Sequence, residues 1–173
     1  METIFIEGMT DTKRIKAGTK ILNESFKMSI AQIVKILVDC FNGGGKILVM
    51  GNGGSSAESD HMASEFISHG FPAISLNNPA TITAIANDHS YKEVFARQVW
   101  ALGREGDILV GISTSGKSKN ILEAYKIAKK LGVNIIDWPR KRIPQNARDV
   151  TRIQEEQLKL MHKVYLRLEE FYE

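Results

Sequence analysis

The fold class is decided by the stretch Asp107-Ile108-Leu109-Val110-Gly111-Ile112-Ser113-Thr114-Ser115-Gly116-Lys117-Ser118. Its first six residues predict a strand, because the five that follow Asp107 form a short apolar run of the kind buried on both faces of a parallel sheet. Residues 119–131 then carry apolar side chains at helical spacing. The stretch therefore predicts a buried strand, a polar loop over residues 113–118, and a helix.

The same alternation extends to both sides of this stretch. We expect further strands at 46–50, 71–76 and 133–136, and helices at 11–42, 56–68, 79–87, 91–102 and 152–171. Strands that alternate with helices predict an α/β fold, a three-layer sandwich around a parallel, doubly wound sheet. Long N-terminal and C-terminal helices flank this sheet. Residues 142–144 are a candidate short strand.

The length of 173 residues suits a single domain over 1–173. We expect N-terminal helices over about 11–42, a sheet core over about 46–144 and a C-terminal helix over about 152–171. In such folds, ligands bind beyond the carboxyl ends of the strands.

Composition narrows the classes of partner. Cys40 is the one cysteine, so a disulfide framework and a multi-cysteine metal site are excluded within one chain, and its apolar neighbours predict a buried thiol. The net charge of +3, with scattered basic residues, predicts no nucleic-acid partner. No apolar run approaches the ~20 residues that span a bilayer, and the N-terminus does not resemble a signal peptide. We therefore expect no membrane partner and a cytoplasmic location.

The loop Ser113-Thr114-Ser115-Gly116-Lys117-Ser118 supplies four hydroxyls between a buried strand and a helix. Backbone N–H groups at a helix N-terminus, together with hydroxyl donors, form an anion site. The loop has neither the spacing of a Walker A motif nor that of a dinucleotide-binding turn, so no nucleotide cofactor is expected. The alternative is a polar turn with an N-cap serine.

Four other groups of residues are candidates for a site. The turn Gly51-Asn52-Gly53-Gly54-Ser55-Ser56 allows close approach of a ligand to the backbone, or is a structural tight turn. His61 and Glu65 share a helix face and suit an acid/base pair, two metal ligands, or a surface pair. Gln154 and His162 can face one cleft from the last helix, or His162 is a surface or satisfied core histidine. Asn87-Asp88 suits a helix-ending turn.

Taken together, these motifs resemble the phosphoheptose isomerases of the sugar isomerase (SIS) domain family. The resemblance rests on Gly51-Asn52-Gly53-Gly54-Ser55, Asp60-His61-x-x-x-Glu65, Ala86-Asn87-Asp88, residues 111–118 and Arg152-Ile153-Gln154-Glu155, in that order along the chain. It implies an enzyme that converts sedoheptulose 7-phosphate to D-glycero-D-manno-heptose 7-phosphate, for heptose in lipopolysaccharide or other surface glycans. It also implies a homotetramer with active sites between subunits.

The resemblance also implies roles for individual residues. Glu65 and His162 would be the catalytic acid/base pair, and a zinc ion would be held by His61, Glu65, Gln154 and His162. The residues that would bind the substrate are Asn52, Gly53, Gly54, Ser55, Glu65, Asn87, Asp88, Ser113, Thr114, Ser115, Ser118 and Gln154.

The chain departs from its relatives at several positions. His69 stands where an arginine is usual, Thr151 where an acidic residue is frequent, and Gln157 where many members carry a histidine. Relatives have a glycine-rich loop and a further helix where this chain has only residues 136–142. If this is a true deletion, a crossover helix is lost and the last strand is displaced or absent.

Two other functions fit the same motifs. One is a non-catalytic SIS module that binds a sugar phosphate or regulates a partner, and the other is an isomerase for a different sugar phosphate. The presence of both Glu65 and His162 favours an enzyme.

Overall fold

Four parallel strands form the central sheet, in the order β2-β1-β3-β4. The computed structural model describes residues 28–139 and 145–173. The strands are β1 (Ile47–Gly51), β2 (Ala73–Ser75), β3 (Ile108–Ile112) and β4 (Asn134–Asp137). The four expected strands are confirmed within two residues at each end.

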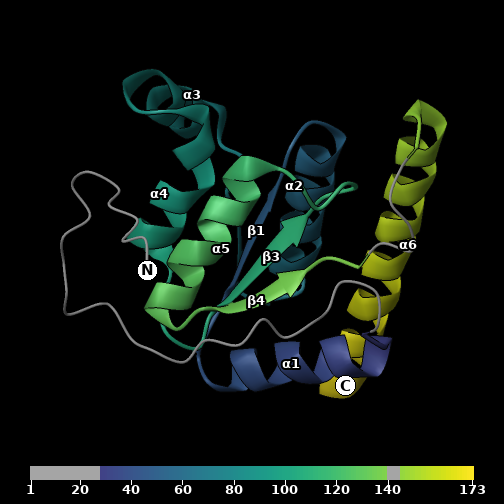
Figure 1. Ribbon diagram of the computed structural model, residues 1–173. Coiled ribbons are helices and arrows are strands. Elements are labelled where there is room, and N and C mark those ends of the chain that lie inside the picture. The colour runs from purple at the N-terminus through teal and green to yellow at the C-terminus, as the bar shows by residue number, and fades with distance from the viewer. Residues whose placement is uncertain (1–27, 140–144) are drawn as a thin grey trace.

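Helices cover both faces of this sheet (Figure 1). One face packs against α1 (Ile30–Asn42), α2 (Gly54–Ser68) and α6 (Ala147–Tyr172), and the other against α4 (Val94–Leu102) and α5 (Lys119–Leu131). The short helices α3 (Pro79–Asp88) and η2 (Tyr91–Glu93) lie between β2 and α4. The predicted three-layer α/β sandwich with a parallel sheet is confirmed.

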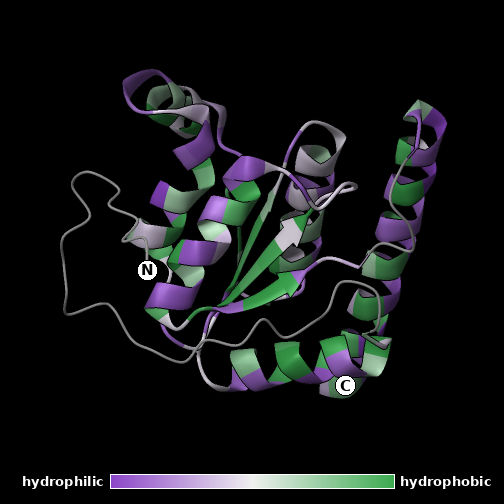
Figure 2. Ribbon diagram, viewed as in Figure 1, coloured by the Kyte–Doolittle hydropathy of each residue, from purple (hydrophilic) through white to green (hydrophobic). Residues whose placement is uncertain are grey.

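The strand residues build two separate cores. In β1, Ile47 and Val49 pack with α1, α2 and α6, while Leu48 and Met50 pack with α4 and α5. Every residue of β1 and β3 is buried, which explains why these strands are continuously apolar instead of alternating. Figure 2 shows the strands as largely hydrophobic and the helices as mixed.

Several helix boundaries differ from the sequence prediction. α1 begins at Ile30 with a capping box formed by Ser29 and Gln32, and residues 11–27 of the predicted N-terminal helix lie outside the described residues. The helix expected over 91–102 is divided into η2 and α4. α6 starts at Ala147, because the Asn146 side chain caps it by accepting a hydrogen bond from the Asp149 amide.

The short connection after β4 leads directly towards α6. Within the described residues no helix and no fifth strand lies between them, as expected for a lost crossover helix; the candidate strand at 142–144 lies outside those residues. Trp138 is buried and its Nε1 donates to the Gln157 carbonyl at 3.2 Å. This contact joins the end of β4 to α6. The single-domain boundaries stay a prediction.

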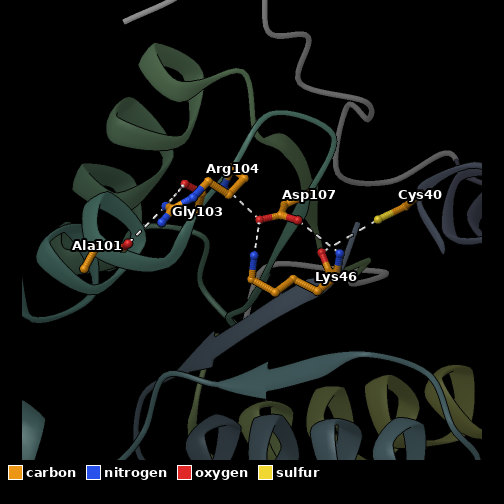
Figure 3. A network of polar contacts seen from close by, with 6 residues as sticks. All are labelled: Cys40, Lys46, Ala101, Gly103, Arg104 and Asp107. Atoms are coloured by element: carbon orange, nitrogen blue, oxygen red, sulfur yellow. Dashed lines mark hydrogen bonds and ion pairs between the residues drawn. The ribbon is translucent and has the colours of Figure 1, made fainter. Parts of the chain in front are cut away.

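A buried ion pair joins the amino ends of β1 and β3 (Figure 3). The Asp107 carboxylate accepts hydrogen bonds from Lys46 N at 3.0 Å, Lys46 Nζ at 2.6 Å and Arg104 N at 2.8 Å. Cys40 lies beside this network and is buried, as predicted. Burial, followed by the nearby Asp107 carboxylate, raises the pKa of Cys40 to about 11.

Candidate active site

Two polar turns begin side by side at the carboxyl edge of the sheet. Gly51 pairs with Ile112, so the glycine-rich turn after β1 and the serine-rich loop after β3 start at neighbouring positions. The site predicted from parallel strand order is therefore formed from segments about sixty residues apart in the chain.

The serine-rich loop is held in shape by its own hydroxyls. Ser113 is buried and its Oγ accepts a hydrogen bond from the Gly116 amide at 3.0 Å, while Ser115 Oγ accepts from Lys117 N at 3.2 Å. Gly116 has a φ of 67°, a left-handed conformation that glycine adopts without strain. Ser118 is the N-cap of α5, yet its side chain does not cap the helix. The Lys119 and Asn120 amides in the first turn of α5 are thus available to an anion, whereas the Ile121 amide donates to Asn120 Oδ1.

Two glycines of the glycine-rich turn, Gly51 and Gly54, pack closely against neighbouring residues. A Cβ at Gly51 would lie 2.2 Å from the Ser55 carbonyl oxygen, and a Cβ at Gly54 would lie 2.3 Å from Gln154 Nε2. Gly53 is the N-cap of α2, with a φ of 58° and no side chain to cap the helix. The absence of a side chain at Gly54 is what lets Gln154 reach the turn from α6.

His61 on α2 contacts both predicted acid/base residues, Glu65 on the same helix and His162 on α6. His61 Nε2 and His162 Nε2 are 3.0 Å apart, although the residues are 101 positions apart in sequence. Glu65 Oε1 lies 3.8 Å from His61 Nε2. A hydrogen bond between two imidazole nitrogens needs one donor and one acceptor, so at least one ring is neutral at this contact. The side chains of His61 and Glu65 are 43% and 31% exposed, so a ligand can reach them.

The histidine pair also suits two of the ligands of a zinc ion. Two nitrogens bound to a tetrahedral zinc at ~2.05 Å lie about 3.3 Å apart, close to the separation of His61 and His162. Glu65 does not complete a three-residue site with them, because residues 28–139 and 145–173 contain no group of three or more His, Cys, Asp or Glu side chains that could hold a metal ion. The described residues therefore provide two zinc ligands, His61 and His162.

Asn87 and Asp88 lie at the C-terminal end of α3. Both are exposed, and Asn87 Nδ2 donates to Asp88 Oδ1 at 2.9 Å. None of the residues of α3 is buried. The structure thus places this pair on an exposed helix end, and its contact with a sugar stays a prediction.

Three residues at the site were not singled out from the sequence. Asn120 and Tyr91 hydrogen-bond to Asn52. Glu58 lies on α2 one turn before His61, and its Oε2 is buried without a hydrogen-bond partner in the described part of the chain. Burial raises the pKa of Glu58 to about 7. In the sequence, only the spacing of three residues between Glu58 and His61 indicates that Glu58 lies near the site. This indication is weak, because carboxylates are common in helices.

The positions that depart from the relatives have structural roles here. His69 ends α2, with Nδ1 2.9 Å from the Glu65 carbonyl oxygen and its ring tilted at 57° against Tyr165, the ring centroids lying 4.7 Å apart. Gln157 is buried, and its Nε2 donates to the Ser113 carbonyl at 3.5 Å. Thr151 Oγ1 donates to the Ala147 carbonyl within α6.

Comparison with known proteins agrees with this geometry. A family model described as the SIS domain matches residues 12–137, so the fold and the site define an SIS domain. Phosphoheptose isomerases from Thermodesulfovibrio yellowstonii and Clostridium acetobutylicum are 39% and 40% identical to the chain. The alignments cover 87% and 92% of this chain, and 85% and 91% of the relatives.

Solved structures give the same result. A phosphoheptose isomerase from Neisseria gonorrhoeae superposes with a TM-score of 0.74 at 33% identity, over 82% of this chain and 85% of that protein. One from Francisella tularensis gives 0.74 at 35% identity, with the same coverage. The chain therefore belongs to the phosphoheptose isomerase family of SIS domain proteins. No helix among the described residues is long and apolar enough to cross a membrane.

Proposed function

We propose that the chain converts sedoheptulose 7-phosphate to D-glycero-D-manno-heptose 7-phosphate. The observation that carries this proposal is the meeting of His61, Glu65 and His162, from α2 and α6, beside two turns suited to an anion. The reaction moves a proton from C1 to C2 of the sugar through a cis-enediol, while the carbonyl moves from C2 to C1. It requires one group for carbon-bound protons and one for oxygen-bound protons.

Glu65 and His162 supply these two groups. The Glu65 carboxylate removes the proton from C1 and returns it to C2 of the enediol. His162, whose partner His61 can donate or accept at Nε2, exchanges protons between the two sugar oxygens. Neither step consumes a reductant or oxidant, because the electrons lost at one carbon are gained at the other.

The serine-rich loop holds the phosphate far from the reacting carbons. The open amides at the start of α5 and the hydroxyls of Ser113, Thr114, Ser115 and Ser118 are donors for its oxygens. Binding energy gained there positions C1 and C2 against Glu65 and His162. Gln154 and the backbone of Gly53 and Gly54 lie at the sugar end of this arrangement.

A zinc ion belongs to the same proposal. His61 and His162 would hold it, with Glu65 and Gln154 as the further ligands, and it would polarise the sugar carbonyl when bound. Zinc added to chelator-treated protein should raise the melting temperature, and the rise should be absent in His61→Ala. An equal rise in that variant would remove His61 from the zinc site.

The proposal extends to assembly and cellular role. A homotetramer is supported by the exposed apolar side chains of Ile67, Leu166 and Phe171, which are 57%, 53% and 60% exposed on α2 and α6. Light scattering of the purified protein would measure the subunit number. The product would supply heptose for lipopolysaccharide or another surface glycan from the cytoplasm.

The decisive experiment incubates purified protein with sedoheptulose 7-phosphate and follows the aldose product, with and without zinc. Turnover supports the proposal, whereas binding without turnover under both conditions favours a non-catalytic SIS module. Glu65→Gln should lower kcat by about 10²–10⁴-fold while the substrate still binds. Glu170→Gln, on the exposed end of α6, is the matched control.

A second variant tests the phosphate loop. Ser115→Ala removes one hydroxyl from a half-buried position and should raise KM more than it lowers kcat. An unchanged KM would show that the phosphate is bound elsewhere.

A further inference from the structure

A reciprocal pair of carboxamides joins the two turns of the site. Asn52 Nδ2 donates to Asn120 Oδ1 at 3.0 Å, and Asn120 Nδ2 donates to Asn52 Oδ1 at 2.8 Å. Asn52 follows β1 in the glycine-rich turn, and Asn120 lies in the first turn of α5, two residues after Ser118. Asn120 is 3% exposed and Asn52 is half-buried, so the Asn120 side of the pair is shielded from water. Shielding strengthens these bonds and makes an unpaired amide there costly.

Each oxygen of the pair also accepts a second hydrogen bond. Asn120 Oδ1 accepts from the Ile121 amide at 3.0 Å, and Asn52 Oδ1 accepts from the Tyr91 hydroxyl at 2.9 Å. A backbone amide can only donate, so Ile121 fixes which end of the Asn120 carboxamide carries the oxygen. The orientation of Asn52 and the direction of the Tyr91 hydrogen bond follow from it.

This arrangement leaves Asn52 little capacity for a ligand. A carboxamide oxygen has two lone pairs, and both are used at Asn52. One N–H of Asn52 is given to Asn120, so a single N–H is left for a sugar hydroxyl. Asn52 thus acts mainly as a bridge between the turns, and the sugar end meets the backbone of Gly53 and Gly54.

We propose that Asn120 is a positioning residue, which holds the glycine-rich turn and the phosphate loop at a fixed separation through Asn52. Tyr91 extends the network to the segment that follows Asn87 and Asp88. This inference rests on the proposed function, because it concerns two ends of one sugar phosphate. Without the bridge, substrate binding must also fix the two turns relative to each other. Part of the binding free energy is then spent on ordering the protein, so we expect KM to rise.

The test is a double-mutant cycle with Asn52→Ala, Asn120→Ala and the double variant. Each single change breaks the same pair, so each should raise KM about tenfold, and the double variant should also raise it about tenfold. Independent contributions would instead multiply to about a hundredfold and overturn the proposal. Asp107→Asn, at the opposite edge of the sheet, should lower the melting temperature without changing KM.

Two further measurements separate positioning from general destabilisation. Tyr91→Phe removes one hydroxyl from a side chain that is 57% exposed, so the fold should survive and KM should rise about two- to threefold. Amide hydrogen exchange of ligand-free Asn120→Ala should be faster over residues 51–56 and 113–119, and unchanged there in Asp107→Asn. Unchanged KM in both Asn120→Ala and Tyr91→Phe, or unchanged exchange in Asn120→Ala, would refute the proposal.

These measurements also distinguish failure of the proposed function from failure of the positioning role of Asn120. Wild-type protein without turnover would refute the proposed function, while the exchange measurement would still decide whether Asn120 joins the turns. Wild-type turnover with a multiplicative cycle would refute the positioning role alone.

Discussion

Asp107→Ala tests the ion pair that closes the amino edge of the sheet. The carboxylate is almost fully buried and accepts three hydrogen bonds, two of them from backbone amides of Lys46 and Arg104 (Figure 3). Removing it leaves the Lys46 ammonium without a partner and two amides without an acceptor. The network lies at the amino ends of β1 and β3, away from the turns at the carboxyl edge.

The expected loss of stability is about 3 kcal/mol. Breaking a buried ion pair costs roughly 3–5 kcal/mol. The lower end applies because the Lys46 side chain is 24% exposed, so its ammonium can recover part of its hydration. For a chain of this size, each kcal/mol lowers the melting temperature by about 2–4 °C, so a fall of roughly 6–12 °C follows.

Thermal and urea unfolding would measure this loss, with Asp39→Ala as the matched control. Asp39 pairs with Lys35 at 2.9 Å, but the two side chains are 63% and 74% exposed, so the expected cost is at most about 0.5 kcal/mol. The kcat of Asp107→Ala at 20 °C should match that of wild type. Equal melting temperatures for the two variants would refute the assignment of stability to the buried network.

Two more predictions follow from the site. In Gly54→Ala, the new Cβ meets only the far end of the Gln154 side chain, so the melting temperature should change little while kcat/KM falls about tenfold; an unchanged kcat/KM would show that Gln154 need not hold its position. Gly51→Ala instead meets the Ser55 backbone at 2.2 Å and should unfold at lower temperature, as circular dichroism would show. Burial raises the pKa of Glu58 in the folded state from 4.5 to about 7. The free energy of unfolding of the wild type therefore falls as pH rises from about 4.5 to 7, and it stays at the lower value above pH 7. Glu58→Gln should therefore melt higher than wild type at pH 8 and nearly equal to it at pH 4.5; an equal difference at both values would contradict the raised pKa.

The sequence predicted most of the elements because their patterns are local. Residues 108–112 are apolar throughout, and a strand of that kind is buried on both faces wherever it lies in a parallel sheet. The start of α6 was placed five residues late, because its N-cap, Asn146, follows a segment without clear periodicity. The break between η2 and α4 was missed, since both pieces share helical spacing.

The candidate site was predicted in part. His61 and Glu65 share a helix face by spacing alone, but only the packing of α2 against α6 brings His162 within 3.0 Å of His61. Asn120 was overlooked because an asparagine near a helix start is common, and its partner lies 68 positions away.

The sequence by itself determined the class of fold and the edge of the sheet at which the turns gather, since both depend on periodicity and on the shared direction of parallel strands. The tertiary structure decided which side chains meet: His61 with His162, Asn52 with Asn120, and Gln154 with Gly54. Such contacts depend on the distance and angle at which elements pack, and these are set by the summed shape of two hydrophobic cores instead of by any local run of residues.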